Sequence, residues 1–214
     1  MTVLKKLPRQ IGGNPRVYLA DGFAADGEIA HVLGRYANQP DNLGIAWDQT
    51  IAGVSGELPI DADRVLAALA NRIEAVLGFG NALADRSFRF RSYAHGDYHP
   101  AHVDCYEIAG HHLVATALVY LTDALDGGET VFPDACPVPL TIAARRGRLA
   151  LWFNYTPDGS VDRLSSHRSE ALQLGEKTTL AYFVYAPIAC AALGPVAAGD
   201  FAATIPAEAI CASS

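Results

Sequence analysis

Three features are scarce in this sequence: long hydrophobic runs, closely spaced cysteines and clustered basic residues. No apolar run approaches the roughly 18 to 20 residues of a membrane-spanning helix, so we expect a soluble chain with no membrane partner. The cysteines are far apart and form no C-x-x-C pair, which predicts free thiols in a reducing compartment. They are Cys105, Cys136, Cys190 and Cys211.

Positive charge is also in short supply. The chain has 16 Lys and Arg residues against 23 Asp and Glu, and the densest basic stretch is ARRGR at 144–148. A nucleic-acid footprint needs clustered basic residues, so we expect no nucleic-acid partner. The start, MTVLKKLPRQIGGNPR, has two lysines but no apolar segment typical of a secretory signal, which favours a cytoplasmic protein.

The periodicity that is present indicates one domain, which we predict to span residues 1–214. Apolar residues recur at helical spacing within 26–38 and 61–80. An Asp at the start of the second segment and Gly78 at its end fit an N-cap and a stop. The residues between these segments are rich in turn formers and predict a loop with a short strand, so we expect a helical support over about 20–86.

From about residue 87 the pattern changes to short runs rich in β-branched and aromatic residues, divided by Gly, Pro and Asp. Such runs predict a mainly β core with flanking helices, a sandwich or barrel over about 87–187. The Pro- and Ala-rich tail, about 188–214, has no clear period. The predicted strands are 87–93, 113–121, 129–132, 148–154, 170–174 and 178–185.

His102 and Asp104 lie two residues apart. On a strand they would point to the same face and could present an imidazole and a carboxylate to one metal ion. With seven His and 23 acidic residues, chance supplies about one such His-x-acid pair, and the chain has a second, His95 and Asp97. We predict a surface turn for the second pair, because Gly96 between them weakens a regular strand.

Two more residues complete a candidate site. A two-His, one-carboxylate iron site needs a second His, and His167 is the best candidate, at the start of a run that could pair with the 178–185 strand. Ten residues later, Lys177 opens an apolar strand, where a charge is costly unless it meets an anion. A strand-end lysine that reaches water remains the alternative at this point. The remaining histidines weighed for this role are expected to be solvated: His31, His99, His111 and His112.

Several motifs follow one another in order between about residues 88 and 185. A Gly-Gly-Glu-Thr turn and a Phe-Pro lie within 127–133, and 145–167 carries a strand and loop before the second His. His167, Gly175 and Lys177 show a ten-residue His-to-Lys spacing with a Gly two residues before the Lys. This set resembles the prolyl 4-hydroxylase-like family of iron(II)- and 2-oxoglutarate-dependent dioxygenases. The family's Y-x-x-G-x-x-Y-x-x-H-x-D is matched here to Tyr93, Gly96, Tyr98, His102 and Asp104.

The resemblance implies a double-stranded β-helix (jelly roll) that holds iron(II), with 2-oxoglutarate and O2 as cosubstrates and ascorbate as a further candidate requirement. It implies that His102, Asp104 and His167 are the metal ligands and catalytic centre. Lys177 would pair with the distal carboxylate of 2-oxoglutarate, and Tyr93 would hydrogen-bond it. The implied reaction hydroxylates an unactivated C–H of a prolyl or other amino-acid residue and releases succinate and CO2. The carboxylate ligand favours hydroxylation, because halogenating relatives lack it.

The chain departs from the family near the lysine. Thr178 follows it where many relatives have Trp, and Glu170 and Ala171 replace a Cys-Pro. The substrate therefore stays open between a prolyl peptide and a free amino acid or other small metabolite. Candidate substrate contacts are Trp47, Arg91, Arg168 and Glu170, although Arg89 and Arg91 also fit the solvated side of a half-buried strand.

Functions of other classes are also consistent with the residues. A non-catalytic sensor of iron and 2-oxoglutarate would keep the same fold, and a zinc hydrolase uses some of the same ligand types. The zinc hydrolase does not explain Lys177 or Tyr93. Cys105 and Trp152 are expected to be packing residues. A homodimer is one hypothesis for the assembly.

Overall fold

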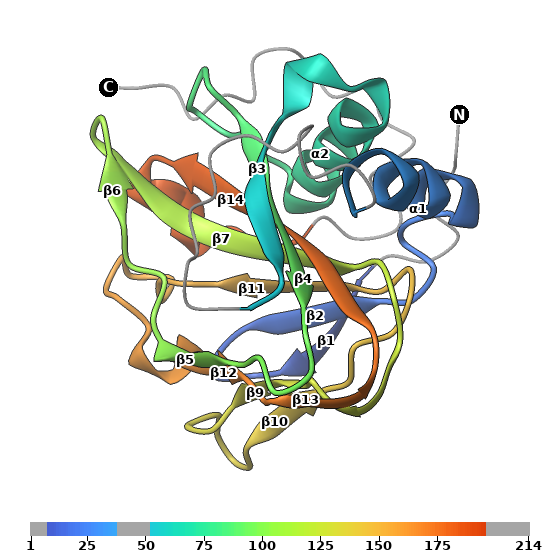
Figure 1. Cartoon of the computed structure of the whole chain (residues 1–214). Coiled ribbons are helices and arrows are strands. Elements are labelled where there is room, and N and C mark those ends of the chain that lie inside the picture. The colour runs from blue at the N-terminus through green and yellow to red at the C-terminus, as the bar shows by residue number, and fades with distance from the viewer. Residues whose placement is uncertain (1–7, 38–51, 196–214) are drawn as a thin grey trace.

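The computed structural model describes residues 8–37 and 52–195, and antiparallel strands are the main secondary structure in them. The strands form a large sheet and a smaller one, and the principal helices lie against the outer face of the large sheet (Figure 1). The architecture is a jelly roll, so the predicted mainly β fold with flanking helices is confirmed. Trp47 and the residues from 196 onward lie outside the described residues.

The large sheet has the strand order β1-β2-β11-β7-β14-β4-β3, and β6 pairs with one end of β7. Its central strands are almost fully buried, because helices cover one face and the smaller sheet covers the other. The strands are β1 (Arg9–Gly12), β2 (Val17–Ala20), β3 (Val54–Pro59), β4 (Ser87–Tyr93), β6 (Glu107–Ile108), β7 (His111–Tyr120), β11 (Leu149–Phe153) and β14 (Lys177–Ala186).

The smaller sheet has the order β10-β9-β12-β5, and β8 and β13 form a separate pair. An apolar cluster that includes Tyr120, Phe132 and Trp152 joins strands of the large and smaller sheets. The cavity described below lies between these two sheets. The strands are β5 (His99–His102), β8 (Ala124–Gly127), β9 (Thr130–Phe132), β10 (Leu140–Ile142), β12 (His167–Ser169) and β13 (Leu172–Gly175).

Both predicted helices are present, and the second is shorter than its predicted segment, 61–80. In α2 (Arg64–Leu77), the Asp63 side chain accepts a hydrogen bond from the Val65 amide at 2.8 Å, and Gly78 closes the helix with φ +78°. The helix α1 (Asp26–Val32) continues as a π turn, η1 (Leu33–Ala37). Short 3-10 turns are η3 (Ile60–Ala62), η4 (Arg163–Ser165) and η5 (Ile188–Ala192). None of the described helices has the length and apolar character that a membrane crossing requires.

Strand β4 shows how the sequence divides its two faces. Phe88 and Phe90 belong to the same core cluster as the buried face of α2, whereas Arg89, Arg91 and Tyr93 line the cavity. Alternation along a strand produces this division, since successive side chains point to opposite faces. One face of β4 therefore packs in the core with α2, and the other face lines the cavity.

Two expectations about strands need correction. Strands β1 and β2 were not anticipated, and they extend the large sheet beyond β11. The run 167–174 is not one strand against 178–185, because it divides into β12, which pairs with β5 and β9, and β13, which pairs with β8. The physical reason is that β14 already has β7 on one edge and β4 on the other, which leaves no edge open.

Candidate metal centre

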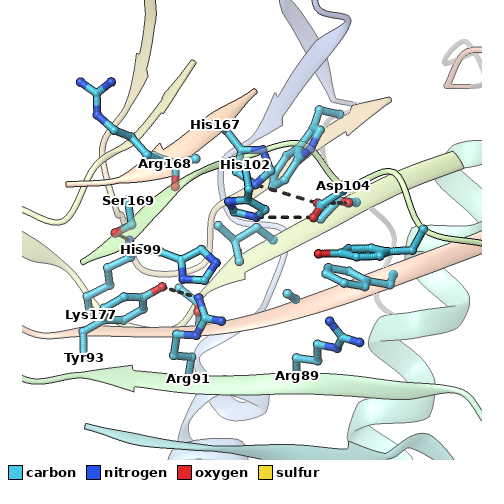
Figure 2. A pocket seen from close by; sticks show the side chains of 18 residues that line it. Arg89, Arg91, Tyr93, His99, His102, Asp104, His167, Arg168, Ser169 and Lys177 are labelled. Atoms are coloured by element: carbon cyan, nitrogen blue, oxygen red, sulfur yellow. Dashed lines mark hydrogen bonds and ion pairs between the residues drawn. The ribbon is translucent and has the colours of Figure 1, made fainter. Parts of the chain in front are cut away.

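Three side chains, from two neighbouring strands and the segment that follows one of them, meet at one end of the cavity. His102 ends β5, Asp104 follows two residues later, and His167 begins β12 directly opposite His102 in the antiparallel register. Their candidate ligand atoms all lie within 4.8 Å of one another, and the two imidazole centroids are 4.3 Å apart (Figure 2). The structure thus brings together the three residues that the sequence assigned to a metal site.

Backbone carbonyls orient both imidazoles. The Nδ1 atom of His102 lies 2.9 Å from the Pro100 carbonyl oxygen, and that of His167 lies 3.0 Å from the Ser165 carbonyl oxygen. A carbonyl can only accept, so in the neutral form of each imidazole Nδ1 carries the proton and Nε2 is left with a lone pair. Both Nε2 atoms face Asp104, at 3.5 and 3.9 Å from its carboxylate. This is the arrangement of histidines that bind a metal through Nε2.

The Asp104 carboxylate is buried, with only 2% of its residue surface exposed. Thr116 Oγ1 donates to it at 2.8 Å, and Asn154 Nδ2 in turn donates to Thr116 Oγ1 at 3.0 Å. Burial alone would raise the pKa of Asp104, but the hydrogen bond from His102 and the nearby imidazoles hold it below its usual value. Asp104 is therefore ionised at neutral pH.

The pKa values of the two imidazoles shift in opposite directions. Burial lowers the pKa of His167 to about 4, which leaves it neutral at pH 7. Burial also acts to lower the pKa of His102, but the hydrogen bond and charge of Asp104 outweigh it and raise that pKa. A cation in this site would compete with the proton for His102 Nε2. One carboxylate and two imidazole donors suit a divalent transition metal such as iron(II).

At the other end of the cavity, Lys177 is buried, with 2% exposure. Its Nζ donates to Ser169 Oγ at 2.5 Å and lies 4.4 Å from the centroid of the Tyr93 ring (Figure 2). Burial and the positive charge of Arg91 lower the pKa of Lys177 to about 7. The alternative of a lysine that reaches water is wrong for this position. An anion bound beside Nζ would offset the cost of its burial.

Of the four candidate substrate contacts, two line the cavity. Arg91 lines the cavity and is 8% exposed, so the expectation of a solvated face is wrong, because the smaller sheet covers this side of β4. Arg168 also lines the cavity, and its Nη2 pairs with the Glu170 carboxylate at 2.7 Å. Glu170 is not among the lining residues. Trp47 lies outside the described residues.

The competing pair, His95 and Asp97, forms a turn as predicted. The Asp97 carboxylate accepts hydrogen bonds from the backbone amides of Ala52, Gly53 and Ala94 at 2.7 to 2.9 Å. Asp97 therefore ties the start of β3 to the turn after β4. The structure gives this pair a role in positioning the chain, apart from the metal centre.

One match to the family motif needs correction. The spacing Y-x-x-G-x-x-Y-x-x-H-x-D, counted from Tyr93, places His99 and not Tyr98 at the second Tyr position. The structure agrees, since Tyr98 is 59% exposed whereas His99 lines the cavity with its ring 4.6 Å from that of His102. The expectation that His99 is solvated is wrong. The motif spacing was the signal that could have identified it.

Other residues at the site were missed or misplaced. Thr116 and Ser169 were not anticipated, since a hydroxyl in a strand gives no sequence signal of its partner. Cys105 is exposed and does not pack in the core, because the chain leaves β5 before Asp104 and the strand alternation no longer applies. Trp152 packs as predicted, with its ring 4.6 Å from that of His167.

No family model matches the chain. It is 25% identical over 204 residues to probable prolyl 4-hydroxylase 7 of Arabidopsis thaliana, an alignment that covers 82% of the chain and 64% of that relative's length. It is also 25% identical over 209 residues to probable prolyl 4-hydroxylase 4 of the same plant, with 83% and 70% covered. These relatives agree with the resemblance to the prolyl 4-hydroxylase-like family that the motifs indicate.

Solved structures of prolyl hydroxylases have a similar fold. The viral collagen prolyl hydroxylase of Paramecium Bursaria Chlorella virus-1, solved as a 2-oxoglutarate complex, matches with a TM-score of 0.64 at 18% identity, over 79% of this chain and 95% of that one. A Trichoplax adhaerens prolyl hydroxylase in complex with a peptide fragment matches with a TM-score of 0.56 at 19% identity, with 80% and 84% covered. The chain therefore shares their fold.

Proposed function

We propose that the protein is an iron(II)/2-oxoglutarate-dependent dioxygenase that hydroxylates a C–H bond of a prolyl or other amino-acid unit. The overall reaction consumes 2-oxoglutarate and O2 and yields the hydroxylated product, succinate and CO2. One observation carries the proposal: the His102, Asp104 and His167 donor set and the buried Lys177 face the same cavity.

The donor set fits iron(II) on its own chemistry. His102 and His167 would bind through Nε2, and Asp104 through a carboxylate oxygen. Bound iron would supply the activation of O2 and of 2-oxoglutarate that these side chains cannot provide. Three protein ligands leave other coordination positions for the cosubstrates. Ascorbate is a candidate reductant for keeping the metal ferrous.

Lys177 would hold the distal carboxylate of 2-oxoglutarate. Its ammonium group lies beside Ser169 and Tyr93 inside the cavity, where a charge-assisted hydrogen bond is stronger than in water. The Tyr93 hydroxyl already accepts a hydrogen bond from Arg91 at 3.0 Å, which fixes its position next to the lysine. These residues would bind and orient the anion where the surrounding sheets leave Lys177 only 2% exposed.

The curated relatives support the hydroxylase assignment by name, and the chain spans about two thirds of their length. Fold alone does not decide the reaction: a structural neighbour with a TM-score of 0.51 and 14% identity is a non-heme α-ketoglutarate-dependent epimerase, SnoN. The hydroxylase proposal therefore depends on the cavity and on the relatives together.

Turnover of the iron-loaded protein tests the proposal. Supplied with 2-oxoglutarate, O2, ascorbate and a panel of prolyl peptides and amino acids, the protein should release succinate and add one oxygen to a member of the panel, as measured by mass spectrometry. The His95→Ala variant is the matched control, because it removes an imidazole from the same segment without touching the donor set. An added oxygen without succinate, or succinate formation unaffected by Asp104→Ala, would contradict the proposal.

A further inference from the structure

A row of three polar side chains from β4 lines the cavity. Arg89, Arg91 and Tyr93 share one face of the strand, about 7 Å apart along it, since alternate residues are separated by twice the strand rise. Tyr93 lies opposite Lys177 in the register with β14, and Arg91 and Arg89 lie opposite Thr179 and Ala181. The two arginines therefore continue the polar row beyond the cosubstrate lysine.

Both guanidinium groups are held in position by aromatic neighbours. Arg91 donates to the Tyr93 hydroxyl at 3.0 Å, and the Arg89 guanidinium lies 4.2 Å from the centroid of the Phe183 ring. Arg89 also approaches the Glu57 carboxylate at 3.9 Å, where both side chains are partly exposed, so that this ion pair is weak. Figure 2 shows Arg91 and Arg89 on the side of the cavity opposite His167 and Asp104.

Arg91 lies near Lys177 and faces the same cavity as the metal ligands. It donates to the hydroxyl of Tyr93, whose ring centroid lies 4.4 Å from the Lys177 ammonium. The side chains of Arg91, His102 and Asp104 line one cavity. A group bound by Arg91 therefore shares the cavity with the metal ligands, where a reacting C–H must lie.

The cavity carries more positive than negative charge. Among the lining residues that the structure describes, Asp104 is the one carboxylate, whereas Arg89, Arg91, Arg168 and Lys177 are cationic. The proposed cosubstrate has two carboxylates, one for Lys177 and one for the metal centre. Two ordered guanidinium groups further along the same strand match a third carboxylate, because the planar fork of arginine binds carboxylates with two parallel hydrogen bonds.

We propose that Arg91 and Arg89 form a binding subsite for a carboxylate of the primary substrate, which is a free amino acid or a similar small carboxylic acid. This inference rests on the proposed function and adds the substrate class to it. An interior residue of a peptide has no backbone carboxylate to offer. A peptide could supply the same group only from its C-terminus or from an acidic side chain.

Paired substrates test the inference on the unmodified enzyme. Each free L-amino acid, L-proline first, is compared with its amide and methyl ester in the iron- and 2-oxoglutarate-loaded protein, by binding and by mass gain of one oxygen. Peptides that end in a free or an amidated C-terminus, and peptides with an internal Asp or Glu, distinguish the other sources of a carboxylate. We expect binding and turnover with free acids and a loss of about 10- to 150-fold for the blocked partners, as for a lost hydrogen bond to a charged group.

Variants locate the subsite. Arg89→Gln should raise the KM for the acid about 10- to 150-fold, while the KM for the cosubstrate changes by less than about threefold. Arg91→Gln should raise the KM for the acid by a similar factor and should change the KM for the cosubstrate less, since Arg91 reaches that site through Tyr93. Arg91→Lys should recover part of the loss, because it keeps the charge without the planar fork. Arg64→Gln is the matched control, because it removes the same charge at an exposed position on α2. Arg89 is partly exposed, so its variant tests the inference even where loss of the buried Arg91 prevents folding.

The outcomes separate the two proposals. Equal turnover of acids and their amides, or no binding of any free acid in the panel, would overturn the carboxylate subsite. The proposed function would stand in either case if other substrates still gave succinate. A larger rise in the KM for the cosubstrate than in the KM for the acid would overturn it too, by assigning Arg91 to 2-oxoglutarate. If the iron-loaded protein did not bind 2-oxoglutarate at all, both the proposed function and the carboxylate subsite would be wrong.

Discussion

Replacement of Lys177 by Met is expected to stabilise the metal-free protein. Burial and the charge of Arg91 lower the pKa of this lysine from 10.5 to about 7. A tenfold change in protonation equilibrium corresponds to about 1.4 kcal/mol, so keeping the ammonium charged inside the fold costs roughly 5 kcal/mol. Methionine has a similar length and carries no charge. The Ser169 hydroxyl would keep its hydrogen bond to the Glu170 carbonyl at 3.1 Å.

The stability gained by Lys177→Met should decrease as the pH rises. The unfolded chain keeps the Lys177 proton up to about pH 10.5 and the folded chain only up to about pH 7, so the stability of the wild type rises with pH across that window. Methionine does not titrate. The free energy of unfolding of Lys177→Met should exceed that of the wild type by roughly 4 kcal/mol at pH 7 and by about 2 kcal/mol at pH 9.

Urea unfolding followed by circular dichroism at pH 7, 8 and 9, in the presence of a chelator, measures this difference. Addition of 2-oxoglutarate to the metal-loaded proteins supplies the control: a concentration about 100 times the dissociation constant should stabilise the wild type by roughly 2.7 kcal/mol and leave the variant unchanged. A variant that is no more stable than the wild type at pH 7, or a difference that stays constant with pH, would refute the account of Lys177 as a costly charge kept for an anion.

Three further predictions concern the same cavity. Asp104→Ala should abolish iron binding and turnover, whereas His95→Ala should leave both largely intact; equal losses would refute the choice of pair. Thr116→Val should weaken iron binding about 10- to 100-fold by removing a hydrogen bond to Asp104, with Thr116→Ser as the control, measured by competition with a chelator. The dissociation constant for the cosubstrate should be constant below pH 7 and should rise by up to about tenfold per pH unit above it, as Lys177 loses its proton; a flat profile from pH 6 to 9 would contradict this.

Much of the architecture could be predicted from local pattern. The cap residues of α2, the alternation in β4 and the central strands β7 and β14 carry their own signals, because burial on a helix stripe or sheet face dictates the residue type. The division of 167–174 into β12 and β13 carries no such signal. It depends on which sheet edges are already occupied, and that is a property of the whole fold.

The candidate site divides in the same way. The metal donors were identifiable because several motifs follow one another in the order of a known family, and Lys177 also because a charge in an apolar strand needs a reason. Arg91 was ambiguous, since alternation alone does not reveal that both faces of β4 are covered. Thr116 and Ser169 were invisible, because their importance lies in partners that only the tertiary fold supplies. A cytoplasmic location and the oligomeric state stay predictions of the sequence.

Anaerobic titration of the iron(II)-loaded protein with 2-oxoglutarate tests the central claim most directly. If His102, Asp104 and His167 hold iron and Lys177 anchors the keto acid, a weak visible charge-transfer band of the chelate should appear and saturate, and Asp104→Ala should abolish it. Folded, metal-loaded protein that shows no band at any concentration of 2-oxoglutarate would contradict the account and would mean that the chain shares the fold of these enzymes without their chemistry.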